Sequence, residues 1–189
     1  MTGGDRGASS PDDHAFTHLD ATGHAHMVDV TEKPVTQRQA TARCIVRAAP
    51  GAFEAVAKDE DLSPFARAAG VHAAKRAPSL IPLCHPLPLD DVDIRVEIDA
   101  ARGVADVRAS TSVVARTGIE IEALTACAFT GLTLLMALRE NDPDAQLSTL
   151  ALWHKSGGRS GTWVRATAPA TTAPATTAPA TTAPATTAP

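Results

Sequence analysis

Alternating apolar and polar residues predict a strand in the middle of the chain, and the residues after it predict a second strand that returns beside it. Apolar and charged positions alternate across residues 92–98, which is the pattern of a half-buried strand. A second strand is expected over residues 104–115, and Ala101-Arg102-Gly103 supplies a turn, so the two runs predict a hairpin. A β-branched cluster in residues 39–48 predicts an earlier strand, and residues 147–154 predict a last one.

Helical spacing predicts two helices between these strands. The first is expected over residues 63–76, with a serine as its N-cap, and should end before Pro78. The second should run over residues 117–140 and open with a capping box formed by Thr117 and Glu120. We expect its buried face to consist of Leu124, Cys127, Ala128, Leu132, Leu135 and Leu138.

The order of these elements is β-α-β-β-α-β, which predicts an α+β fold of the ferredoxin-like kind. Two helices would then cover one face of an antiparallel sheet. We assign this domain to residues 16–165 and expect residues 1–15, rich in Gly, Ser, Asp and Pro, to be a disordered tail. Residues 166–189 are of low complexity and end in four copies of Ala-Thr-Thr-Ala-Pro, which predicts an extended tail.

Composition narrows the classes of function. The net charge of −4 argues against a nucleic-acid-binding protein, which usually carries a basic domain. Cys44, Cys84 and Cys127 are widely spaced and form no CxxC, which is typical of reduced thiols in the cytosol. The chain shows no apolar run of about 20 residues and no signal peptide, so we expect a cytoplasmic protein that does not enter a membrane.

Residues 75–89 are the most unusual stretch of the chain. Four prolines remove backbone donors and predict a rigid loop, with Cys84 and His85 at its centre and two cations, Lys75 and Arg76, at its start. Neighbouring residues in extended backbone point to opposite sides, so Cys84 and His85 are not expected to form a nucleophilic dyad. His85 is either a functional group or a histidine hydrogen-bonded within a stiff loop, and Cys84 is more simply a small buried group.

Residues 155–161, Lys-Ser-Gly-Gly-Arg-Ser-Gly, form a second candidate site. Backbone N–H groups of such a loop can converge on an anion, with Lys155 and Arg159 supplying charge. The alternative is a flexible turn after the last strand. The segment lacks the order of a Walker A loop.

Two further groups of side chains have structural and functional interpretations. Glu120 and Glu122 open the second helix, where carboxylates favour the helix dipole; about 200° separates them, so only one should point at a given site. His24 and His26 with Asp29 suggest a metal site or, more simply, a solvated loop. We expect no bound metal and no cofactor.

Five ordered blocks of sequence closely resemble those of one family. They include LIPLCHPL at residues 80–87, GIEIEALT at 118–125 and KSGGRSG at 155–161, preceded by MVDV at 27–30 and AAKR at 73–76. These blocks resemble the MoaC family, the cyclic pyranopterin monophosphate synthases of molybdenum cofactor biosynthesis. The resemblance covers residues 17–165.

The resemblance implies a ferredoxin-like subunit in a homohexamer, built as a trimer of dimers with active sites between subunits. The family converts 3′,8-cyclo-7,8-dihydroguanosine 5′-triphosphate to cyclic pyranopterin monophosphate and releases pyrophosphate. The match implies ten substrate-binding positions, which are Asp29, Lys33, Arg38, Leu83, Cys84, His85, Glu120, Ile121, Glu122 and Lys155. Arg159 is added to them because of its charge. Lys75, Lys155 and Arg159 would hold phosphates, while His85 and Glu122 would orient the guanine-derived ring.

Lys75 and His85 are also the retained candidates for catalysis, because other catalytic positions of the family differ here. Met136 stands where the family has an active-site Asp, and Arg139 stands where it has a catalytic Lys. Methionine transfers no proton, and an arginine stays protonated in proteins. Asp59 occupies the position of another family lysine, with Lys58 beside it.

These departures leave three interpretations of the chain. It is a working synthase in which Lys58, Glu140 or His154 replaces the missing groups, or a non-catalytic paralogue that binds the nucleotide or joins mixed oligomers. The third interpretation is a related rearrangement of another cyclised nucleotide, with Met136 reshaping the pocket.

Overall fold

The computed structural model describes residues 18–19, 22–56 and 62–166. The expected tails at 1–15 and beyond Ala166, as well as Lys58 and Asp59, lie outside these ranges. The described elements, in chain order, are β1 (Thr36–Arg47), α1 (Ala52–Val56), α2 (Leu62–Leu80), β2 (Asp91–Asp99), β3 (Val104–Ala115), α3 (Glu120–Leu138), β4 (Gln146–Ser156) and β5 (Trp163–Val164).

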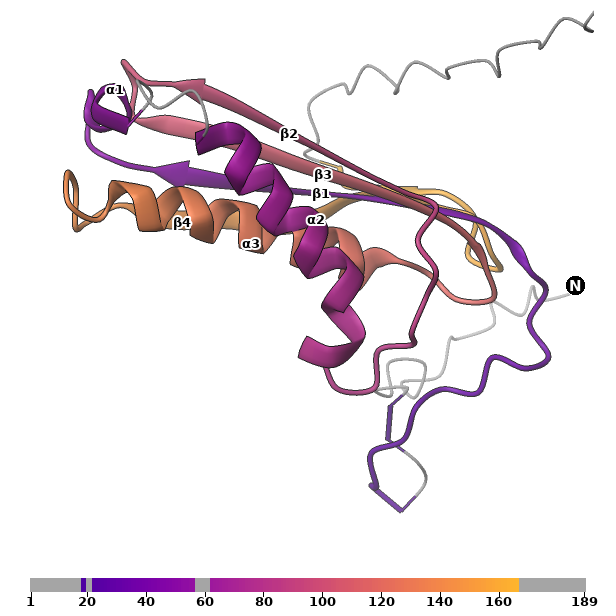
Figure 1. Ribbon diagram of the computed structural model, residues 1–189. Helices are drawn as coiled ribbons and strands as arrows, with labels where there is room; N and C mark the ends of the chain where they lie inside the picture. Colours follow the sequence, from indigo (N-terminus) through magenta and orange to yellow (C-terminus); the bar gives the residue numbers. More distant parts are fainter. Residues whose placement is uncertain (1–17, 20–21, 57–61, 167–189) are drawn as a thin grey trace, which may run out of the picture.

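The strands form one antiparallel sheet in the order β2-β3-β1-β4-β5. Its first four members have the ferredoxin-like order, so the predicted α+β fold is confirmed (Figure 1). The β2–β3 hairpin is also confirmed, and β3 has the predicted bounds. The short α1 and the two-residue β5 were not predicted, because neither is long enough to show a periodic pattern.

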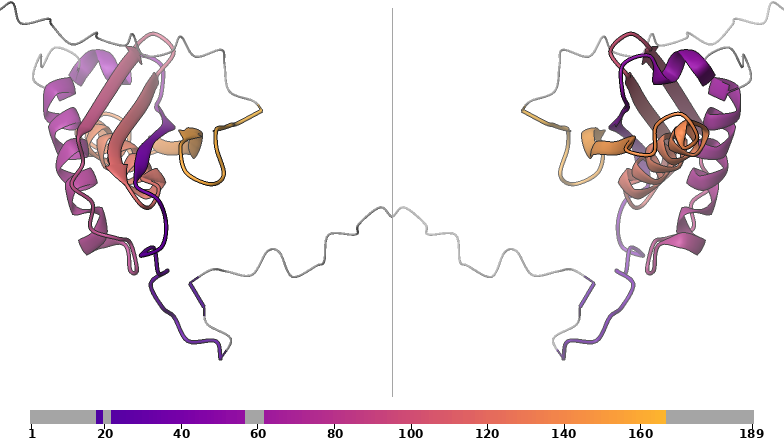
Figure 2. Two further views of the ribbon diagram at one scale, coloured as in Figure 1. Left: turned by 90° about the vertical axis from the view of Figure 1, so that its right-hand side faces the viewer. Right: turned by 90° about the vertical axis from the view of Figure 1, so that its left-hand side faces the viewer.

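Both long helices pack on the same face of the sheet (Figure 2). Buried residues alternate along β3, and they meet the buried side of α3. α2 packs beside α3 and against β2. The two helices approach closely at Gly70, where an added Cβ would overlap the side chain of Thr130. This layered core leaves one end of the molecule to loops, and these loops build the site.

The first helix ends later than the sequence predicts. α2 starts at Leu62 and continues past Pro78 to Leu80, and the amide of Ile81 still donates to Ala77 O at 2.9 Å. The predicted end near Arg76 is therefore wrong. Proline lacks only its own N–H, and its φ suits a helix, so a proline in the last turn removes one hydrogen bond without ending the helix. The rigid loop is correspondingly shorter and begins after Leu80.

The second helix differs from expectation at its start and on its surface. Its N-cap is Ile119, and no side chain caps it, so the predicted capping box of Thr117 and Glu120 is wrong. Leu132, expected to be buried, is 50% exposed, whereas Leu134 is fully buried. The error arises because α3 carries apolar residues around most of its circumference, so periodicity does not identify the buried side.

By length and composition α3 is the one described helix that could cross a membrane. In this fold it is a core helix, because it packs on β1, β3 and β4.

Candidate functional site

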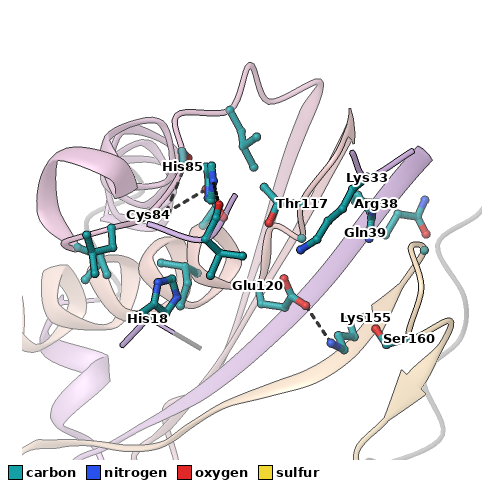
Figure 3. A pocket seen from close by; sticks show the side chains of 18 of the residues that line it. His18, Lys33, Arg38, Gln39, Cys84, His85, Thr117, Glu120, Lys155 and Ser160 are labelled. Atoms are coloured by element: carbon teal, nitrogen blue, oxygen red, sulfur yellow. Dashed lines mark hydrogen bonds and ion pairs between the residues drawn. The ribbon is translucent and has the colours of Figure 1, made fainter. Parts of the chain in front are cut away.

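Loops and strand ends at one end of the sheet enclose a cavity of about 790 Å³ (Figure 3). It is bounded by the start of α3, the loop after α2, the segment before β1 and the end of β4. Nine of the expected substrate-binding residues line it, and they are Lys33, Arg38, Leu83, Cys84, His85, Glu120, Ile121, Glu122 and Lys155. The fold thus brings together positions from five separate parts of the sequence.

Glu122 is the deepest carboxylate of this cavity. Its residue is only 2% exposed, and the Cys84 thiol donates to Oε1 at a sulfur–oxygen distance of 3.5 Å. Burial raises the pKa of Glu122, and the negative charge of Glu120 adds to the effect. Burial and the neighbouring carboxylate raise the pKa of Cys84 to about 12. Cys84 is therefore a neutral hydrogen-bond donor near pH 7, not a thiolate nucleophile.

Glu120 also lines the cavity, on its more open side. Lys155 Nζ lies 3.2 Å from Glu120 Oε1, and their side chains are 31% and 29% exposed (Figure 3). The expectation that only one of the two glutamates could serve a given site is wrong. The cavity wraps around the first turn of α3, so it reaches both sides of the helix. A carboxylate–ammonium pair and a buried carboxylate consequently share one cavity.

His85 is fixed by a contact to the segment before β1. Its Nε2 lies 2.9 Å from Val28 O, and because a carbonyl only accepts, Nε2 carries the hydrogen. Cys84 and His85 thus have different partners, in keeping with the expectation that they form no dyad. Leu83, just before them, has a left-handed backbone with φ of 65°. The loop holds its three site residues in one specific backbone shape.

Arg38 lies between the cavity and the glycine loop after β4. It is 9% exposed, its Nη2 donates to Arg116 O at 3.2 Å, and its buried Nε has no hydrogen-bond partner in the described part of the chain. Gly157 and Gly158 have φ of 93° and 72°, and a Cβ at Gly158 would overlap the guanidinium of Arg38. Both glycines are required for the loop to lie against this arginine.

Arg159 lines a smaller adjoining cavity of about 380 Å³ rather than the larger one. Lys33, Arg38 and Arg116 contribute to the same smaller cavity, which makes it strongly basic. Phosphate oxygens are the ligands that such a cluster of cations attracts.

Four expected site residues lie elsewhere in the chain. Asp29 accepts hydrogen bonds from the backbone and hydroxyl of Thr31, at 2.9 and 2.7 Å, and so stabilises a turn; these two bonds lower its pKa. Lys75 is exposed on α2. Met136 is 62% exposed, and Arg139 is exposed just beyond the C-terminal end of α3. The cavity is lined by the other end of this helix, its first turn.

Several residues of the site were not predicted from the sequence. Gln39 and Thr117 line the larger cavity, and Arg116 lines the smaller one. The pairing of β1 with β3 brings them together, and no local motif marks them. Among the residues that the structure describes, no group of three or more His, Cys, Asp or Glu side chains could hold a metal ion. His24, which the sequence offered with His26 and Asp29 as a less favoured metal site, has its Nδ1 2.8 Å from Thr22 Oγ1.

The fold and the site define a ferredoxin-like α+β protein with a mixed acidic and basic pocket for a small polar molecule. The MoaC family model matches residues 27–158, and the chain belongs to the MoaC family.

Curated relatives are similar in sequence to most of this chain. It is 45% identical over 154 residues to a cyclic pyranopterin monophosphate synthase of Thermomicrobium roseum, a match that covers 79% of this chain and 93% of the relative. The corresponding synthase of Roseiflexus sp. is 43% identical, with 79% and 97% covered. Cyclic pyranopterin monophosphate synthase 1 of Mycobacterium bovis is 42% identical, with 82% and 95% covered.

Proposed function

We propose that this chain acts in molybdenum cofactor biosynthesis as a cyclic pyranopterin monophosphate synthase. It would convert 3′,8-cyclo-7,8-dihydroguanosine 5′-triphosphate to cyclic pyranopterin monophosphate and pyrophosphate, in the cytoplasm. The observation that carries this proposal is the combination, in one cavity, of three cations with a buried carboxylate. Lys33, Arg38 and Lys155 share the cavity with Glu122.

Each half of such a substrate has a matching part of the cavity. The triphosphate would bind Lys33, Arg38 and Lys155, with Arg159 reached through the adjoining basic cavity. Glu122 would accept hydrogen bonds from N–H groups of the guanine-derived ring, and His85 would orient the ring from the proline loop. On substrate binding, phosphate replaces Glu120 as a partner of Lys155, because a phosphate carries more charge than a carboxylate.

We further propose that the site is completed by a second copy of the chain. Met136 lies 14 residues along α3 from Glu122, about 21 Å at 1.5 Å per residue. Neither it nor Arg139 can reach the cavity of its own chain. Phe129, Leu132 and Met136, at 39%, 50% and 62% exposure, form an apolar stripe on one side of α3. A hexamer built as a trimer of dimers would cover this stripe and bring Lys75, Met136 and Arg139 to neighbouring sites.

The test is turnover of the enzymatically made cyclic triphosphate by the purified full chain. Pyrophosphate release and the pterin product are measured together with binding. Formation of both products at a common rate supports the proposal. Binding of the substrate without turnover would overturn it and leave a paralogue that binds the nucleotide; co-purification with a second MoaC-family chain would then identify a mixed oligomer.

A further inference from the structure

An arginine that follows the neighbouring strand β3 holds the segment before β1, in addition to the contact that His85 makes with Val28. Residues 26–35 belong to no helix or strand. Arg116 Nη1 nevertheless donates to two of their carbonyls, Thr31 O at 2.6 Å and Lys33 O at 2.7 Å. Strand pairing does not satisfy these carbonyls, so the arginine determines the path of the backbone that leads to Lys33.

The register of the sheet explains why Arg116 can do this. Thr36, the first residue of β1, pairs with Ala115, the last residue of β3. Arg116 is therefore opposite Val35, and its side chain reaches back along the segment. In the described part of the chain its guanidinium donates to carbonyl groups and forms no ion pair with a carboxylate.

The backbone of Arg116 makes a second connection to the site. Its carbonyl accepts a hydrogen bond from Arg38 Nη2 at 3.2 Å. One residue thus fixes the main chain of Lys33 through its side chain and the guanidinium of Arg38 through its carbonyl. Both of these cations line the larger and the smaller cavity. Because like charges repel, such a cluster needs fixed partners to keep its geometry before an anion arrives.

We propose that Arg116 is a positioning residue that orders the segment from Val28 to Lys33 and so places Lys33 for an anionic group of the ligand. This inference rests on the proposed function for the identity of that ligand. The ordering itself is a property of the free protein. A segment that is already ordered before the ligand binds loses less entropy on binding, so the affinity is higher although no new contact to the ligand is made.

The first experiment follows amide hydrogen exchange in the ligand-free chain. The amides of Thr31 and Lys33 donate to Asp29 Oδ1 and Val30 O, at 2.9 and 3.0 Å, so the turn protects them. Arg116→Met keeps the aliphatic stem and removes the donors. We expect exchange at these two amides to become at least about tenfold faster, while Arg116→Lys, which retains a donor and the charge, stays within about threefold of the original chain.

Arg102→Met is the matched control, since Arg102 pairs with Asp99 in the β2–β3 hairpin, outside both cavities. It should leave the exchange at Thr31 and Lys33 unchanged. Unchanged exchange in Arg116→Met would overturn the proposal. If Arg116→Met does not fold, Arg116→Gln, whose amide is too short to reach both carbonyls, is measured in the same way.

The second experiment separates positioning from direct contact with the ligand. For the cyclic triphosphate, Arg116→Met should raise KM about tenfold with kcat within about twofold, and Arg116→Lys should largely restore KM. On a Lys33→Met background, Arg116→Met should add less than about twofold, because it acts through Lys33. If the fold-changes in KM of Arg116→Met and Lys33→Met multiply in the double variant, Arg116 contacts the ligand itself, and the proposal is overturned. If there is no turnover, calorimetry with inorganic pyrophosphate compares the affinities of the same single and double variants. Failure of the proposed function can thus be distinguished from failure of the positioning role of Arg116.

Discussion

The two ends of α3 present opposite surroundings to their side chains. At its start, Glu122 is 2% exposed and bonded to Cys84, and Glu120 pairs with Lys155. At its other end, Met136 is 62% exposed, and Arg139 forms no ion pair among the described residues. One end is a cavity whose two carboxylates already have partners. The other end is an open apolar surface with a cation, which is the character of a surface that a partner covers.

The reactivity of Cys84 tests how firmly the start of α3 is held. Alkylation requires the thiolate, and a pKa of about 12 makes that form rare at pH 7.5. We expect iodoacetamide to label Cys84 about 10³-fold more slowly than a cysteine in the unfolded chain, as measured by mass spectrometry of the Cys84 peptide. Glu122→Gln removes one cause of the shift and should speed labelling several-fold. Rapid labelling of the folded chain would contradict the hydrogen-bonded thiol.

The far end of α3 is tested by introducing the Asp and Lys that the family resemblance predicts at positions 136 and 139. Met136→Asp with Arg139→Lys should raise pyrophosphate release by about 10²-fold, since general acid–base groups contribute roughly 10²–10⁴. The matched control is Met136→Asn with Arg139→Lys, because asparagine has the shape of aspartate without its proton chemistry. Equal rates for the two double variants would show that the far end takes no part in proton transfer.

A charge in the apolar stripe tests whether copies cover it. Leu132→Asp should raise the dissociation constant of the assembly by about tenfold or more, because the carboxylate would lose its water in the interface. Sedimentation velocity over a range of protein concentrations gives the masses. Ala101→Asp, in the exposed turn of the β2–β3 hairpin, is the control. An unchanged mass for Leu132→Asp would mean that the stripe faces water.

The smallest expected effect concerns stability at the start of α3. The pKa of Glu122 is raised in the folded chain, so the folded state binds this proton more tightly than the unfolded state. Its contribution to stability is present at low pH and is lost as pH rises through the folded pKa. Glu122→Gln should therefore be more stable by about 1 kcal/mol at pH 8, with the gain vanishing towards pH 4. Urea unfolding at several pH values measures this, with the exposed Glu54→Gln as control.

The strands could be predicted because successive side chains of a strand point to opposite faces of the sheet, so buried and exposed positions alternate. β3 alternates along its whole length, and its bounds were correct. Helix surfaces were harder, as Leu132 shows, because α3 is apolar on nearly every side. The end of α2 was missed because a proline near the last turn is compatible with helix, and the sequence does not say how many residues follow it.

Residues of the site could be predicted from local motifs, but contacts between residues far apart in the sequence could not. Cys84 and Glu122 were both expected from their motifs, but their hydrogen bond depends on tertiary packing. Arg116 was missed altogether, because its role follows from the pairing of Thr36 with Ala115. Residues that act through strand register leave no local pattern to find.

The backbone of Leu83 has a consequence for how this chain would change under selection. A leucine at φ 65° is less favourable than a right-handed one by roughly 1–2 kcal/mol, and a glycine has no such penalty. Leu83 also lines the larger cavity. A random library screened only for survival after heating should therefore accumulate glycine codons at this position, and a library screened for ligand retention should lose them. The two selected libraries would then differ at codon 83, with glycine enriched in the first and depleted in the second.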